Sequence, residues 1–149
     1  MTPFTLCAAT SNGNAHNNHY PNHHQVTGTP DLERVARLDH VAATYTGDRR
    51  SSASFISSDC VVMDIDNDHT DNPADWVTPE QLSELMTGVV FMTATSRNHQ
   101  KPKGMVSARP RFHVYFPISP VTDADTYAGL KRRLAAGFGF FDQQALDAG

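Results

Sequence analysis

The stretch Cys60-Val61-Val62-Met63-Asp64-Ile65-Asp66-Asn67-Asp68 is an apolar run that ends in carboxylates. Its length and its β-branched residues predict a strand. Side chains alternate between the two faces of a strand, so Asp64 and Asp66 share one face. At a rise of about 3.3 Å per residue, the Cα atoms of these two aspartates lie roughly 6 to 7 Å apart. Both carboxylates can therefore bind one hard cation.

A second stretch, Arg109-Pro110-Arg111-Phe112-His113-Val114-Tyr115-Phe116, has the same alternation. Arg111 and His113 share one face, and Phe112 and Val114 share the opposite one. If the two strands belong to one sheet, one face forms a core. The other face presents two carboxylates beside an arginine and a histidine, which is a combination suited to a metal ion and an anion.

The length is typical of one domain, because 149 residues is close to the commonest domain size. Cys7 and Cys60 lie far apart, without the Cys-x-x-Cys spacing of a zinc or redox pair, which favours a reduced, cytoplasmic setting. No apolar run approaches the roughly 18 residues of a membrane span. The first residues also lack the basic and apolar pattern of a signal peptide. We therefore expect no membrane partner.

The formal net charge of −4 conceals a division along the chain. Between Asp59 and Glu84, every charged residue other than histidine is acidic, whereas basic residues predominate between Arg97 and Arg133. An acidic segment that faces a basic one is typical of a site where cations and polyphosphate meet. Ordinary solvated surface charge is the alternative.

Residues 1–28 are rich in polar residues and show no apolar periodicity. We expect an irregular or poorly ordered arm there. Four histidines in this segment lack a cysteine or carboxylate at ligand spacing, which favours a polar tail over a zinc site; they are His16, His19, His23 and His24. Residues 29–149 are then the folded domain.

The pattern of the domain predicts an α+β fold. We expect helices over 29–44, from Thr78-Pro79 to about Gly88, and over 122–136. Further strands are expected at 89–94, 112–118 and 138–142, with a polar, basic loop at 95–107. The order from Cys60 is β-α-β-β-α-β, typical of an RNA-recognition-like, or ferredoxin-like, antiparallel sheet with helices on one face. Its other face remains free for polar chemistry.

These features together resemble the archaeo-eukaryotic primase superfamily, and most nearly the primase-polymerases of phages, plasmids and other mobile elements. The resemblance covers about residues 31–149. It rests on Asp64-Ile65-Asp66, on the His113 strand, on Phe141-Asp142, and on the phrase Ala94-Thr95-Ser96-Arg97-Asn98-His99. It implies an RNA-recognition-like sheet joined to an N-terminal α/β unit. It also implies that this chain is incomplete at its C-terminus, because relatives continue with further sheet and template-binding segments.

The resemblance implies a role for each matching residue. Catalysis and the binding of two divalent ions, Mg²⁺ or Mn²⁺, are implied for Asp64, Asp66 and Asp142, with Asp147 as the alternative third carboxylate. His113 would contact the triphosphate of the incoming nucleotide. The family usually has a small hydroxyl residue two positions earlier, whereas this chain has Arg111, which can grip phosphate with two donors.

The expected function is that of a DNA primase/polymerase-type nucleotidyltransferase in the replication of a mobile element. Two metal ions about 4 Å apart would activate a 3′ hydroxyl and stabilise the pyrophosphate leaving group. The expected contacts to the nucleoside triphosphate are Arg111, His113, Lys101 and Lys103. The expected contacts to a single-stranded DNA template are Arg97, Arg49 and Arg50. A helicase, in the same chain or separate, is a further candidate partner.

Two alternatives remain open. A rolling-circle-type nicking nuclease would use Tyr127, four residues before Lys131, as its nucleophile, but Tyr115 stands where that class needs a second histidine after His113. An inactive primase-derived module that binds nucleotide or nucleic acid is the non-enzymatic alternative. The acidic run also imitates the start of a calcium loop, yet His69 occupies the position that requires glycine.

Overall fold

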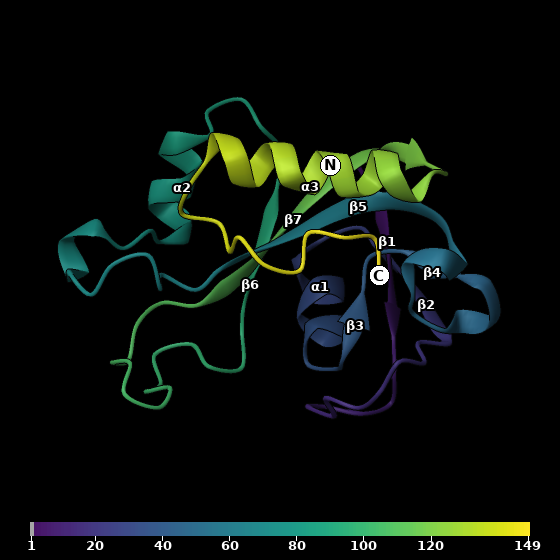
Figure 1. Ribbon diagram of the computed structural model, residues 1–149, viewed down its shortest axis with the longest axis horizontal. Helices are drawn as coiled ribbons and strands as arrows, with labels where there is room; N and C mark the ends of the chain where they lie inside the picture. The colour runs from purple at the N-terminus through teal and green to yellow at the C-terminus, as the bar shows by residue number, and fades with distance from the viewer. Residues whose placement is uncertain (1) are drawn as a thin grey trace.

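The computed structural model describes residues 2–149, which form an α+β fold of two antiparallel sheets and three α-helices (Figure 1). The strands are β1 (Phe4–Ala8), β2 (Asn22–Val26), β3 (His40–Val41), β4 (Thr44–Tyr45), β5 (Phe55–Ile65), β6 (Met92–Thr95) and β7 (Phe112–Val121). The α-helices are α1 (Thr29–Ala36), α2 (Pro79–Leu85) and α3 (Ala124–Gly137). Across residues 2–149, none of the helices has the length and apolar character needed to span a membrane.

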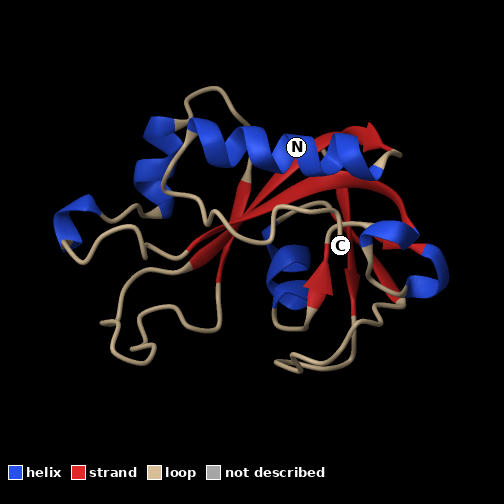
Figure 2. Ribbon diagram, in the orientation of Figure 1, coloured by secondary structure: helices blue, strands red, loops and turns tan. Residues whose placement is uncertain are grey.

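The larger sheet has the strand order β4-β5-β7-β6 and is antiparallel throughout. Helices α2 and α3 lie together on one face of it (Figure 2). The apolar residues that alternate along β5, Val61, Met63 and Ile65, pack in the core under these helices. The predicted alternation of β5 is therefore confirmed. The predicted start of α2 is also confirmed, because Thr78 and Gln81 form a reciprocal capping box.

The expectation of an irregular arm over residues 1–28 is wrong for most of that segment, although Met1 lies outside the described residues. Strands β1 and β2 pair with each other, and β1 also pairs with β3, in a sheet ordered β2-β1-β3. Strand β1 is buried along nearly its whole length, so it lacks the alternation of a half-exposed strand. Strand β2 is mostly polar and buries only Val26. Neither pattern is visible to a search for periodicity.

The helix expected over 29–44 ends at Ala36, because the following residues pair with strands instead. Asp39 exchanges backbone hydrogen bonds with the segment after β1: Ala9 N–H donates to its carbonyl at 2.9 Å, and its own N–H donates to Ser11 at 2.9 Å. Val41 then pairs with Cys7 of β1. These non-local bonds override the local helical propensity of the segment.

The N-terminal unit (β1, β2, α1 and β3) packs against the face of the larger sheet opposite α2 and α3. Leu6 of β1 and Leu32 of α1 share a buried cluster with Cys60 of β5 and Tyr115 of β7. The face that was expected to be free is therefore covered over part of its length. Only the end of the sheet that carries the charged residues remains open.

The strand expected at 138–142 does not form. Residues 138–149 instead run back along the edge of β5, seen in yellow between α3 and the C label of Figure 1. Asp142 N–H donates to the carbonyl of Asp64 at 2.8 Å, and the Tyr45 hydroxyl donates to that of Ala148 at 2.7 Å. Phe141 is buried in the core and contacts the rings of Phe138 and Phe140, so this aromatic run packs through a turn.

Candidate functional site

Rows of paired side chains cross the sheet from β5 through β7 to β6. One row is largely apolar and packs against the N-terminal unit: Val62, Tyr115 and Met92. The next row lines a cavity: Asp64, His113 and Ala94. The N-terminal cover therefore ends where the predicted charged residues begin. Ala94 has a small side chain, which leaves space on the β6 side of His113.

Asp64 and His113 are cross-strand partners joined by a hydrogen bond between the Asp64 carboxylate and His113 Nδ1. An ionised carboxylate can only accept, so Nδ1 carries the proton. Burial opposes ionisation of Asp64, but the hydrogen bond and the charge of His113 outweigh it and lower the pKa of Asp64. The bond fixes the orientation of the imidazole on its Nδ1 side and leaves Nε2 available to a ligand.

Asp66 and Asp142 lie next to this pair. Burial and the neighbouring charge of Asp64 raise the pKa of Asp66, Asp142 raises it further, and Arg111 opposes the increase. The backbone of Asp142 is fixed by its 2.8 Å hydrogen bond to Asp64. Asp147 is exposed, and its carboxylate accepts a hydrogen bond from Gly149 N–H. The structure thus brings Asp142, the first of the two candidates for the third carboxylate, into this group.

Carboxylates are the ligands that a hard divalent cation prefers, and the charges of Asp64 and Asp142 both raise the pKa of the half-buried Asp66. Within residues 2–149, however, no three His, Cys, Asp or Glu side chains converge closely enough to form a metal site as they lie. A cation here would draw together the side chains of Asp64, Asp66 and Asp142.

Arg111 does not line the cavity in the way expected of a phosphate grip. Its side chain is 1% exposed, with Nη1 and Nη2 against the two oxygens of Asp68 at 3.2 and 3.0 Å. The Asp66 carboxylate lies 3.9 Å from Nη1. The two-pronged guanidinium is therefore directed at a carboxylate of the chain itself. Arg111 supplies counter-charge to the acidic group.

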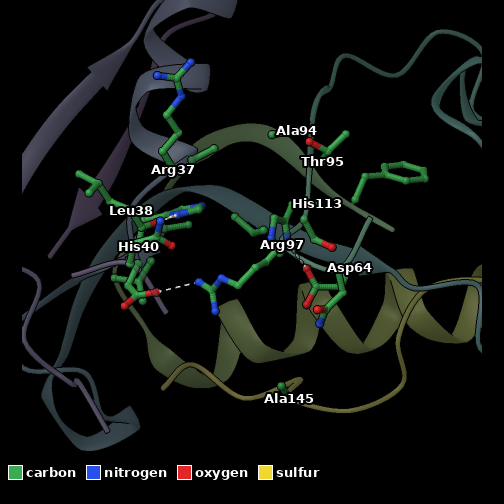
Figure 3. Close-up of a pocket in the computed structure, with 18 of the residues that line it drawn as sticks. Arg37, Leu38, His40, Asp64, Ala94, Thr95, Arg97, His113 and Ala145 are labelled. Carbon is green, nitrogen blue, oxygen red and sulfur yellow. Dashed lines mark hydrogen bonds and ion pairs between the residues drawn. The ribbon is translucent and has the colours of Figure 1, made fainter. Parts of the chain in front are cut away.

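A polar cavity of about 1080 Å³ lies between the N-terminal unit and the larger sheet. Asp64, His113, His40 and Arg97 all line it, with Ala145 of the C-terminal segment on another wall (Figure 3). Its volume is slightly above the usual range of small-molecule sites, which is about 300 to 1,000 Å³, and its lining is more polar than is usual for them. It can hold a charged ligand of nucleotide size.

Of the basic residues predicted to contact nucleotide or template, some line the cavity and others lie outside it. Lys101 and Lys103 line the cavity from the loop after β6. Arg97 also lines it, but its guanidinium donates to Asp39 at 3.1 Å. Arg50 lines the cavity and donates to the carbonyl of Gly149, whereas Arg49 donates to Asn18 outside it.

Two residues that bear on the site were missed by the sequence reasoning. His40 lines the cavity from the N-terminal unit, and its Nε2 lies 2.8 Å from the Tyr115 hydroxyl. Lys131 lies near enough to lower the pKa of Asp64. His40 fell within the overextended helix, so nothing local signalled its position. Lys131 was considered for its spacing from Tyr127, as a template contact or as a solvated helix residue, but not as a neighbour of Asp64.

Tyr127, the nucleophile of the nuclease alternative, is 2% exposed. Its hydroxyl donates to the buried carbonyl of Cys60 at 2.7 Å, and burial raises the pKa of Tyr127 far above its usual value. A phenol that is buried, hydrogen-bonded and hard to ionise is poorly placed to attack a phosphodiester.

Comparisons with known proteins found no significant match among protein-family models, curated proteins or solved structures.

Proposed function

We propose that this chain is a primase/polymerase-type nucleotidyltransferase domain that joins nucleotides on a single-stranded DNA template. One observation carries the proposal: Asp64 and Asp66 line a polar cavity beside the aspartate-bound His113, and the backbone of Asp142 is hydrogen-bonded to that of Asp64. The packing of an N-terminal unit with helix and strands on an RNA-recognition-like sheet also agrees with what the resemblance implies.

The carboxylates form the acidic side of the proposed site. Asp64, Asp66 and Asp142 would hold two Mg²⁺ or Mn²⁺ ions, whose chemistry when bound is Lewis-acid activation of a 3′ hydroxyl and stabilisation of the leaving pyrophosphate. The charge of Arg111 favours the ionised form of Asp66. The 3′ hydroxyl is itself the nucleophile, so the reaction needs no nucleophilic side chain of the protein.

The histidine and the lysines form the phosphate-binding side. Nε2 of His113 can donate to a phosphate oxygen when the ring is protonated, because Nδ1 is already bound to Asp64. Lys101 and Lys103 share the cavity and can neutralise a polyphosphate. Arg50 and Arg97 are the candidate contacts to the template backbone among the cavity residues. Replication of a mobile element inside the cell, together with a helicase, is the proposed setting.

A primer-extension assay with labelled nucleotides, a single-stranded template and Mn²⁺ tests the proposal. Asp64→Asn preserves shape and removes the charge, so we expect a loss of product of about a hundredfold to a thousandfold. Asp75→Asn is the matched control, because Asp75 is an exposed carboxylate outside the cavity, and it should retain activity.

Two other outcomes would contradict the proposal. A covalent protein–DNA adduct that disappears in Tyr127→Phe would support the nicking nuclease. Nucleotide or DNA binding in the absence of any product, with Mn²⁺ or Mg²⁺, would support the inactive binding module.

A further inference from the structure

His40 connects the N-terminal unit to the site through hydrogen bonds with a fixed direction. Nδ1 lies 2.7 Å from the carbonyl of Leu38, which can only accept, so Nδ1 carries a proton. Burial lowers the pKa of His40 and favours the neutral ring. Nε2 is then an acceptor, and the Tyr115 hydroxyl donates to it at 2.8 Å. Tyr115 is fully buried, so water cannot replace this partner.

The rings of His40 and Tyr115 lie beside the ring of His113, whose side chain is 30% exposed. The His40 ring meets the His113 ring edge-on, with centroids 6.0 Å apart and an interplanar angle of 87°. The Tyr115 ring lies 6.3 Å from the His113 ring at 69°. His40 and Tyr115 are themselves stacked, with centroids 5.9 Å apart. Asp64 therefore holds His113 by a hydrogen bond, while the other two rings limit its rotation by contact.

The position of His40 is itself fixed by the N-terminal unit. The preceding residue, Asp39, accepts hydrogen bonds through its carboxylate from Ser11, Gly13 and Asn14 at 2.8 to 2.9 Å. His40 then pairs with Ala8 of β1. A residue held so firmly by one unit, yet in contact with the histidine of the other, can transmit the placement of the N-terminal unit to the site.

We propose that His40 is a positioning residue, which holds the imidazole of His113 in the orientation that presents Nε2 to the cavity. The inference deepens the proposed function and rests on it for its catalytic consequence. Its structural part concerns only the hydrogen bonds and ring contacts of His40, Tyr115 and His113. Orientation of this kind affects the rate more than the affinity, because a misplacement of about 1 Å can cost about a hundredfold.

The first test is the tautomer of His40 in the wild-type protein. A long-range ¹H–¹⁵N correlation spectrum of the side chains distinguishes Nδ1–H from Nε2–H imidazole. We expect His40 to be the Nδ1–H form, the opposite of the form that neutral histidine prefers in water. An Nε2–H ring at His40 would overturn the proposal, because Tyr115 would then have to accept and Leu38 would lose its donor.

The second test compares His40→Ala with His40→Gln. A glutamine amide can donate to Leu38 and accept from Tyr115, so it conserves both hydrogen bonds. We expect His40→Ala to lower kcat about tenfold to a hundredfold, with a smaller change in KM for the nucleotide, and His40→Gln to restore most of it. The orientation of the His113 ring, measured by nuclear Overhauser contacts of its side chain, should change in His40→Ala and return toward wild type in His40→Gln. An unchanged His113 orientation and kcat in a folded His40→Ala protein would overturn the proposal.

The orientation of the His113 ring separates this proposal from the proposed function. If the wild-type protein joins no nucleotides, the proposed function fails, and the response of the His113 orientation still decides whether His40 positions it. If His40→Ala does not fold, Tyr115→Phe removes the same hydrogen bond without a large cavity. A changed orientation of the His113 ring in Tyr115→Phe, measured by the same Overhauser contacts, would support the role of the His40–Tyr115 pair, and an unchanged orientation would overturn it.

Discussion

Arg109 and Arg111 are two residues apart and equally buried at 1% exposure, yet they serve different regions. Arg109 anchors the loop after β5. All five of its N–H groups are used: Nε donates to the Ser107 carbonyl, Nη1 to the carbonyls of Asn67 and Thr70, and Nη2 to Asp71 and the Ser107 hydroxyl. Its guanidinium also lies over the Trp76 ring, 5.0 Å from the centroid.

Arg111 faces the carboxylates of the candidate site with its hydrogen-bonding capacity incompletely used. It forms ion pairs with Asp68 and Asp66, but Nε and Nη2 have no well-directed hydrogen bond. A buried arginine that loses a satisfied partner is costly to the fold, whereas replacing a partly satisfied one by an apolar residue is often neutral. The same residue type on neighbouring positions thus serves structure in one region and electrostatics in the other.

The largest effect is expected for Arg109→Met. It leaves the buried carbonyl of Asn67 without its donor, and the Thr70 carbonyl keeps only its bond from the Trp76 indole. We therefore expect a loss of about 3 to 5 kcal/mol in the free energy of unfolding, measured by urea denaturation. Asp71→Asn is the control, because the Asp71 side chain is 94% exposed and its ion pair should contribute less than about 1 kcal/mol. An equal loss in both variants would assign the stability to the ion pair instead.

Asn67 tests the other side of the Arg109 anchor. Its backbone has a φ of 56°. Its buried side-chain amide accepts a hydrogen bond from Val77 N–H and donates to the carbonyls of Val77 and Pro110. We expect Asn67→Ala to cost about 2 to 4 kcal/mol. Asn67→Gly should cost about 1 kcal/mol less, since glycine adopts this φ without strain. Equal losses in thermal or urea unfolding would show that the backbone conformation carries no cost.

Arg97 is an exposed arginine, unlike Arg109 and Arg111, and it forms an ion pair with Asp39. Burial opposes ionisation of Asp39, but hydrogen bonds from Gly13, Asn14, Ser11 and Arg97 outweigh it and lower its pKa to about 2. Because the folded pKa lies below the unfolded value, this stabilisation is complete above about pH 4 and is lost as the pH falls through about 2.

We therefore expect Asp39→Asn to destabilise the protein by about 1 kcal/mol near pH 6, a modest value for a pair near solvent. The difference from wild type should shrink between pH 4 and 2, as the wild-type carboxyl takes up its proton. Thermal unfolding of both proteins across this range measures it. A difference that persists unchanged at pH 2 would contradict the assignment to the ionised carboxylate.

The smallest effect on stability is expected for Arg111→Met. Methionine fills the buried volume and removes two poorly satisfied donors, while Asp68, with a half-exposed side chain, can turn to solvent. We expect the free energy of unfolding to change by no more than about 1 kcal/mol. A loss as large as that of Arg109→Met, in the same denaturation experiment, would erase the distinction between the two regions.

The alternation of polar and apolar residues was enough to predict β5 and β7, the two central strands of the larger sheet, but not the edge strand β4, which begins in the segment expected to be helical. One face of β5 is covered by helices, and the other face carries charged residues at the end of the strand. The neighbouring residues Met63 and Asp64 therefore already indicated two different environments in the sequence. The capping box at Thr78 and Gln81 similarly marked α2, since it uses only local hydrogen bonds. The position of Asp64 opposite His113 was not predicted, because it depends on the pairing and register of β5 and β7.

The N-terminal unit could not be predicted in this way. Strand β1 is buried on both faces and β2 is mostly polar, so neither shows the period of a half-buried strand. The end of α1 and the position of His40 depend on bonds between Asp39 and residues 9–14, which no local pattern records. The roles of Arg109 and Arg111 were equally hidden, because both are arginines next to the same strand.

The sequence by itself determined which face of β5 carries carboxylates and which residues could meet a cation or a phosphate, because strand geometry alone dictates that alternation. Only the tertiary structure decided how far that face is covered, that Asp142 joins Asp64, and that His40 reaches His113 from another unit. Those features arise from contacts between residues far apart in the chain, whose energies depend on burial and direction that a local pattern does not contain.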